Sequence, residues 1–110
     1  MPSPARIRST IATIAAPPED LLRAAVVHKA LADTTRLRII ARLAEGPATV
    51  SELIELVDLS QPLVSWHLRR LKVAGLVETR RTGREVICTL SREAIERFHE
   101  KEHAMLRMPA

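Results

Sequence analysis

The 110-residue sequence has few aromatic residues, three glycines, one cysteine and no long apolar run. Aromatics make up 2% of the chain, so a core must come from Leu, Ile, Val and Ala, which suits helices packing on helices. One cysteine excludes an intramolecular disulfide and a cysteine-rich zinc finger. No apolar run approaches the roughly 18 residues of a transmembrane helix, and the N-terminal apolar stretch is too short for a secretory signal. We therefore expect one small cytoplasmic domain.

The chain divides into three segments by composition. Residues 1–18 hold four of the seven prolines and show no persistent period, which predicts a flexible N-terminal arm. Residues 19–107 carry regular apolar patterns and form the expected folded domain, and residues 108–110 form a short tail.

Positive charge is concentrated in one part of the chain. The net charge is +4, yet residues 60–84 alone hold six basic residues and one acidic residue. A concentrated positive field suits a polyanion such as nucleic acid, whereas a charge run by itself also fits a solvated surface.

Helical periodicity and end signals predict about five helices. The first covers about residues 19–31, and the second follows the N-cap Asp33 and stops at Gly46. A short third helix starts near Thr49, a fourth follows Ser60, and the last runs from Ser91 to about residue 107. The apolar stripe expected in the second helix consists of Leu37, Ile40, Ala41 and Ala44.

After the fourth helix the apolar period changes from 3.6 to 2. Residues 76–81 and 84–90 are two strand patterns around a Thr-Gly turn, which predicts a β-hairpin. The predicted fold is therefore mainly α with a two-stranded hairpin.

The third and fourth helices, joined by a short turn, form a helix-turn-helix. The second helix of such a motif fits the major groove of B-DNA, and here Val64, Leu68 and Leu71 would fix its pose. Its opposite arc presents the candidate DNA contacts Gln61, Ser65, Trp66, Arg69 and Arg70. The hairpin would act as a basic wing that carries Arg80, Arg81 and Arg84.

Three segments resemble the ArsR/SmtB family of winged-helix repressors. Residues 31–40 (LADTTRLRII) are similar to that family's LADPTRLRIL, and residues 60–71 with 74–77 resemble its LSQSTVSRHLKVLREAGLV. Residues 83–90 (GREVICTL) resemble its wing, GRRVYYRL. These matches span about residues 19–98 in the family's order and spacing, which makes them far more specific than any single motif.

The resemblance implies a homodimer joined by the first and last helices, which binds a DNA operator with two-fold symmetry. The resemblance, carried over residue by residue, implies that the recognition helix contacts DNA through Gln61, Ser65 and the position of Trp66. It also implies that the wing contacts DNA through Arg84. This sequence departs from the family pattern in its recognition helix, where Pro62 and Leu63 replace small polar residues. Trp66 stands where Arg, Gln or His is usual, so the operator sequence cannot be inherited from relatives.

The family's two usual metal sites are absent from the aligned positions. The third helix has no cysteine pair, and Arg92 and Ala94 stand where the zinc type carries ligands. A different set of imidazole and carboxylate groups recurs at helical spacing, with one further candidate in the first helix: Glu96, His99, Glu100, His103 and His28. Such a set suits zinc, nickel or cobalt, and it equally fits a solvated helix face.

The sequence also bears on two other functional classes. A winged helix that contacts proteins instead of DNA would explain the apolar surface of Pro62, Leu63 and Trp66, although the basic wing opposes it. An enzyme finds no support, because the sequence has no nucleophile–base pair and no phosphate-binding glycine loop. His67 either packs between helices or contacts phosphate, and Cys88 is either a packed strand residue or a redox sensor.

Overall fold

The computed structural model describes residues 18–106. Within them, five α-helices and three β-strands follow one another as α2 (Pro18–Leu31), α3 (Thr34–Glu45), β1 (Ala48–Thr49), α4 (Val50–Val57), α5 (Gln61–Val73), β2 (Val77–Thr82), β3 (Glu85–Leu90) and α6 (Arg92–Leu106). The prediction of a mainly α winged helix-turn-helix is confirmed. The predicted arm over residues 1–18, apart from its last residue, and the tail over residues 108–110 lie outside the described residues.

Side-chain caps begin the helices where the sequence predicts them. The Asp33 carboxylate accepts a 2.9 Å hydrogen bond from the Arg36 amide at the start of α3. At the start of α4, Thr49 and Glu52 form a capping box in which each side chain accepts from the other's backbone amide. These bonds lower the pKa of the Glu52 carboxyl, chiefly through the Thr49 amide.

The strands form one antiparallel sheet in the order β1-β3-β2. The predicted hairpin is present, and its turn contains Gly83 at a φ of 62°, where a side chain would be strained. The third strand, β1, was not predicted, since it has two residues and no alternation can be recognised over that length. It pairs Ala48 with Cys88 and thereby ties the hairpin to the start of α4.

The core lies between α3, α4, α5 and the sheet. Its fully buried side chains are Ile39, Leu43, Leu53, Val64, Leu71, Leu76 and Cys88. Three of the four residues in the predicted stripe of α3 are wrong, because Leu37 is half exposed and Ala41 and Ala44 are exposed, whereas Ile40 packs against the core. The helix instead buries the face of Ile39 and Leu43 together with Arg36, whose hydrogen bonds make burial of its charge possible.

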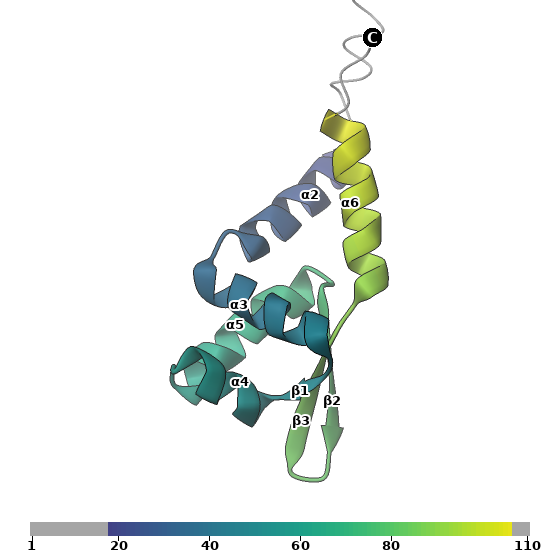
Figure 1. The fold of residues 1–110 in the computed structure, drawn as a ribbon. Helices are drawn as coiled ribbons and strands as arrows, with labels where there is room; N and C mark the ends of the chain where they lie inside the picture. The colour runs from purple at the N-terminus through teal and green to yellow at the C-terminus, as the bar shows by residue number, and fades with distance from the viewer. Residues whose placement is uncertain (1–17, 107–110) are drawn as a thin grey trace, which may run out of the picture.

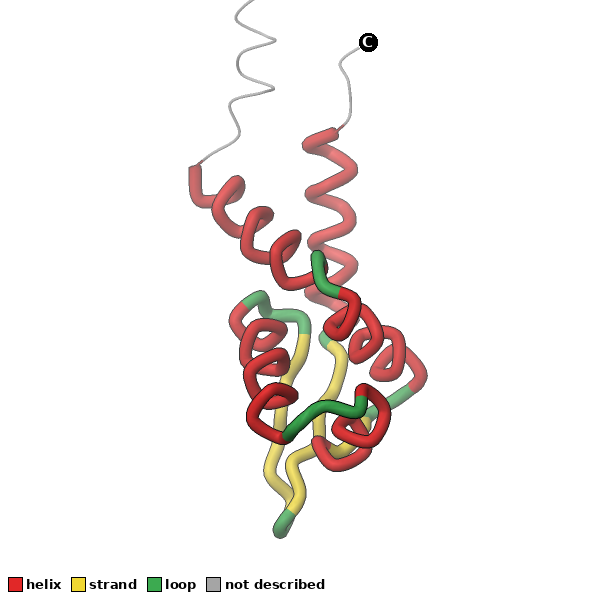
Figure 2. The backbone as a smooth tube through the Cα atoms, turned by 90° about the vertical axis from the view of Figure 1, so that its left-hand side faces the viewer, coloured by secondary structure: helices red, strands yellow, loops and turns green. Residues whose placement is uncertain are grey.

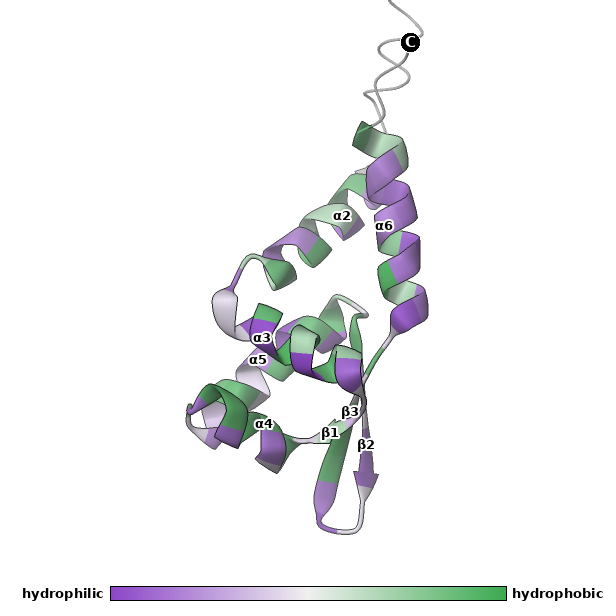
Figure 3. Cartoon of the chain, viewed as in Figure 1, coloured by the Kyte–Doolittle hydropathy of each residue, from purple (hydrophilic) through white to green (hydrophobic). Residues whose placement is uncertain are grey.

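The molecule has two structurally different ends. Helices α2 and α6 lie together at one end, and the β2–β3 hairpin lies at the other (Figure 1). In the perpendicular view the hairpin projects beyond α4 and α5 (Figure 2). Hydrophilic residues, drawn in purple, occupy much of α6 and the part of the hairpin near its turn (Figure 3). Within residues 18–106, every helix is too short or too polar to span a bilayer.

Candidate nucleic-acid interface

Helix α5 is fixed at its N-terminal end and along one side. Asp58, with a φ of 53°, turns the chain after α4, and the Ser60 hydroxyl caps α5 by accepting from the Leu63 amide at 3.4 Å. The buried side chains along its inner face are Val64, Leu68 and Leu71, as predicted. Because these side chains pack into the core, the opposite face of α5 is presented outward in a defined orientation.

A groove of about 570 Å³ separates α4 and α5 from the hairpin. Its polar floor includes Gln61 and Ser65 from the first half of α5. Its basic side chains are Arg69, Lys72, Arg81 and Arg84. Glu85 is the single acidic residue that lines it, so the lining is strongly positive. Gln61 and Arg69 are exposed and Ser65 is half-buried, which leaves all three accessible from this groove.

The sheet register decides which wing arginine faces α5. Arg81 pairs with Val86, and Arg80 pairs with Ile87. Side chains alternate between the two faces of a strand, so Arg81 shares the face of the half-buried Thr79 while Arg80 points to the other face. Of the predicted wing contacts, the groove therefore contains Arg81 and Arg84, and Arg80 lies outside it.

Trp66 and Arg70 lie on a different side of α5 from the groove. The Arg70 guanidinium carbon is 4.9 Å from the centre of the Trp66 ring, and that of Arg36 is 5.6 Å from it. Of the five predicted α5 contacts, Gln61, Ser65 and Arg69 line the groove, whereas Trp66 and Arg70 lie beside Arg36 of α3. All five stay predictions as DNA contacts.

His67 packs between helices, which is one of the two roles that the sequence left open. It is 7% exposed, and its Nδ1 atom lies 3.0 Å from an Arg36 guanidinium nitrogen. Cys88 is fully buried in β3, and this burial raises the pKa of its thiol, as expected of a packed strand residue.

Lys72 is the groove residue that sequence reasoning missed. Gln61, Ser65, Arg69 and Lys72 follow one another at spacings of four, four and three along α5. This spacing places all four side chains on one helical face. The signal was present in the sequence, although only the direction of the wing shows which face matters.

The candidate metal ligands do not meet within the described chain. Among residues 18–106, no three His, Cys, Asp or Glu side chains are grouped so that they could hold a metal ion. The α6 candidates Glu96, His99, Glu100 and His103 are all exposed. The metal site stays a prediction for ligands contributed by two copies of the chain.

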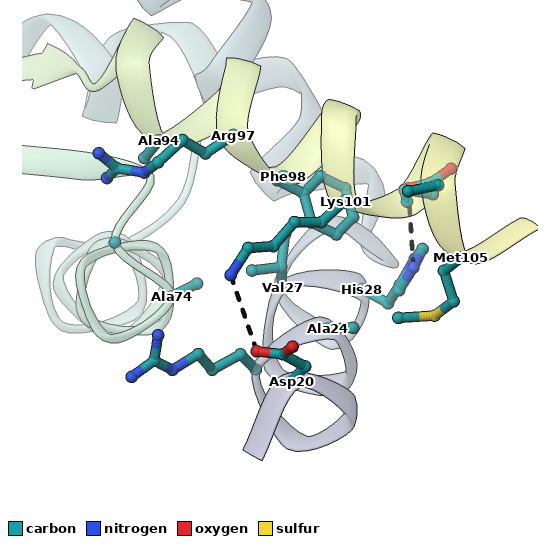
Figure 4. A pocket seen from close by; sticks show the side chains of 14 residues that line it. Asp20, Ala24, Val27, His28, Ala74, Ala94, Arg97, Phe98, Lys101 and Met105 are labelled. Carbon is teal, nitrogen blue, oxygen red and sulfur yellow. Dashed lines mark ion pairs between the residues drawn. The ribbon is translucent and has the colours of Figure 1, made fainter. Parts of the chain in front are cut away.

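His28 lies at a cleft of about 430 Å³ between α2 and α6 (Figure 4). Its ring packs edge-on against Phe98, with centroids 5.0 Å apart, and its Nε2 atom is 3.7 Å from a Glu102 oxygen. A second ion pair, between Lys101 and Asp20 at 3.7 Å, crosses the same cleft. These contacts join the first and last described helices.

Comparison with known proteins agrees with this geometry. Residues 33–79 match the family model described as "Bacterial regulatory protein, arsR family". The chain is 44% identical over 78 residues to the HTH-type transcriptional repressor SmtB of Mycobacterium tuberculosis, a match that covers 70% of this chain and 58% of that protein. The chain thus spans less than two thirds of the length of that relative.

Two further comparisons cover more of the other protein. The transcriptional activator HlyU of Vibrio cholerae is 36% identical over 83 residues, which are 76% of this chain and 77% of HlyU. The solved structure of HlyU from Vibrio cholerae N16961 superposes with a TM-score of 0.65 at 34% identity. That superposition covers 81% of this chain and 97% of the HlyU chain. The names of these relatives are those of transcriptional regulators and not of enzymes.

Proposed function

Because the chain belongs to the arsR family of bacterial regulatory proteins, we propose that it regulates transcription by binding operator DNA through the groove between α5 and the wing. Such a protein acts where the chromosome lies, which in bacteria is the cytoplasm. The observation that carries the proposal is the grouping of four basic side chains around Gln61 and Ser65.

The groove offers two kinds of contact. Gln61 and Ser65 lie in the first half of α5, the part of a recognition helix that reaches base edges in the major groove. A glutamine side chain can bond adenine through two atoms, and a serine can serve several bases or a phosphate. The arginines and the lysine would hold phosphates, which positions the protein without reading sequence.

We further propose that the protein acts as a homodimer. Leu21, Leu22 and Val26 are between 41% and 68% exposed on α2, and Leu106 is 69% exposed at the end of α6. A second copy that covers these apolar side chains would place two recognition helices on one duplex. The operator would then have two-fold symmetry, with half-sites about one helical turn apart.

The test is a fluorescence anisotropy titration with labelled duplexes from the gene's own promoter. We expect one palindromic segment to bind about 10³-fold or more tightly than a scrambled duplex of equal length. Equal affinity for every duplex would contradict an operator-binding role. It would favour the alternative of a winged helix that contacts proteins.

A base-pair scan with Gln61→Ala tests the reading of sequence. We expect the variant to lose discrimination of about 1–3 kcal/mol at one base pair in each half-site, with little change elsewhere. Arg84→Ala is the matched control, because loss of a phosphate contact weakens binding to all sequences alike. A uniform loss with Gln61→Ala would assign Gln61 to the phosphate backbone.

A further inference from the structure

Arg36 is a buried cation in the first turn of α3, with 8% of its surface exposed. Its Nε donates to the Ala30 carbonyl at 2.6 Å, and its Nη2 donates to the Lys29 carbonyl at 3.1 Å. Both carbonyls belong to the last turn of α2, where no later helical amide remains to bond them. Arg36 therefore caps the C-terminal end of α2.

The third contact of this guanidinium is with α5. Its Nη1 lies 3.0 Å from Nδ1 of His67. Since arginine can only donate, Nδ1 accepts and the imidazole carries its single proton on Nε2. Asp33 lies on the same side, with a carboxylate oxygen 3.8 Å from Nδ1. One side chain of α3 thus joins α2 to the recognition helix.

The neighbouring residue of α5 takes part in the same contact. The Trp66 ring faces the Arg36 and Arg70 guanidinium groups and packs edge-on against His67, with ring centroids 4.9 Å apart. A guanidinium near an aromatic face is attracted by the ring's quadrupole. The arrangement therefore holds Trp66 and Arg70 beside α3, away from the groove-facing side of α5.

We propose that Arg36 is a positioning residue for DNA binding, which sets the orientation of α5 by clamping His67 and Trp66 to the last turn of α2. This inference rests on the proposed function. Helix α2 also carries the exposed leucines of the proposed dimer contact, so the clamp links that contact to the recognition helix. In this arrangement Trp66 supports α5 and does not read bases.

Two substitutions of His67 separate the clamp from simple packing. Asn in His67→Asn places an amide oxygen near the position of Nδ1 and keeps the acceptor, whereas His67→Leu fills the space without one. We expect His67→Leu to weaken binding to the operator duplex about ten-fold or more, because a charged donor loses its partner. We expect His67→Asn to restore most of that loss.

A second pair of variants tests the arginine itself. Arg36→Lys keeps the charge but cannot reach three acceptors. Arg38→Lys is its control on an exposed side of the same helix, where Arg38 donates to the Leu56 carbonyl. We expect Arg36→Lys to weaken operator binding and leave binding to a scrambled duplex unchanged. Arg38→Lys should change neither.

Trp66 is the only tryptophan, so its fluorescence reports directly on the clamp. We expect Arg36→Lys and His67→Leu to shift its emission while circular dichroism shows an intact fold. Folded Arg36→Lys and His67→Leu proteins that bind operator as tightly as wild type would overturn the clamp alone. Should Arg36→Lys not fold, equal operator affinity of His67→Leu and His67→Asn would overturn it. Failure of the wild type to bind any duplex would instead overturn the proposed function.

Discussion

Arg81 and Arg80 are adjacent arginines of β2 that differ in the face they occupy, which makes them a matched pair for testing the groove. Replacing either by Ala removes the same charge from nearly the same place, so the long-range field of the protein changes equally. Only Arg81→Ala removes a cation from the groove. A difference between the two variants therefore reports contact with phosphate and not net charge.

The magnitude follows from counterion release. Each phosphate neutralised contributes about 0.9 to the slope of log affinity against log salt. Arg69, Lys72, Arg81 and Arg84 would give about four such contacts per protomer. A dimer would then show a slope of about −7, so that a four-fold rise in salt weakens binding by on the order of 10⁴. Arg81→Ala in both protomers should reduce the slope to about −5, and the same rise in salt would then cost on the order of 10³.

The assay is an anisotropy titration of operator duplex at four or more salt concentrations. We expect Arg80→Ala to keep the wild-type slope, because its side chain lies on the far face of the hairpin. Equal reductions for the two variants would refute the placement of phosphate in the groove. A wild-type slope near zero would refute phosphate binding altogether.

Four further predictions concern stability, pH and ligands. Leu71→Ala should destabilise the fold by about 2–5 kcal/mol in urea unfolding, because the side chain is fully buried. Asp33→Ala should lower the free energy of unfolding by about 1 kcal/mol, because the helix cap is lost. The Arg36 amide lowers the pKa of Asp33, so in the wild type this stabilisation is complete at neutral pH and disappears as the pH falls below about 4. Below that pH the free energies of unfolding of the variant and the wild type should converge. The buried Cys88 thiol, whose pKa burial raises, should react with a thiol reagent only as fast as the protein unfolds, and rapid reaction of folded protein would contradict its burial. If two copies share a metal ion, the double variant His99→Ala/His103→Ala should lose zinc or nickel binding in a calorimetric titration, and unchanged affinity would remove these histidines from the prediction.

Much of the fold follows from local signals in the sequence. Asp33, Thr49 and Ser60 are residues that cap helices through their own side chains, so the starts of α3, α4 and α5 depend on contacts within three residues. The Thr-Gly pair likewise specifies the hairpin turn locally. The motif resemblance predicted the family that the comparisons then confirmed.

In α3, the choice between helix faces was not available from the sequence. Helix α3 has apolar residues on two faces, and the buried one includes Arg36, a residue that a hydropathy pattern assigns to solvent. Its burial becomes favourable only when the carbonyls of α2 and the imidazole of His67 converge on it. His67 lies 31 residues further along the chain, so no local sequence pattern indicates this contact.

The amino-acid sequence by itself determined where the helices and the hairpin begin, the positive charge of residues 60–84 and the family, because each depends on residue type and short-range spacing. Tertiary structure alone decided which arginines share a groove with Gln61, since that depends on the hairpin register and on its direction relative to α5. It also decided that two guanidinium groups lie over the Trp66 ring, because one of them comes from another helix.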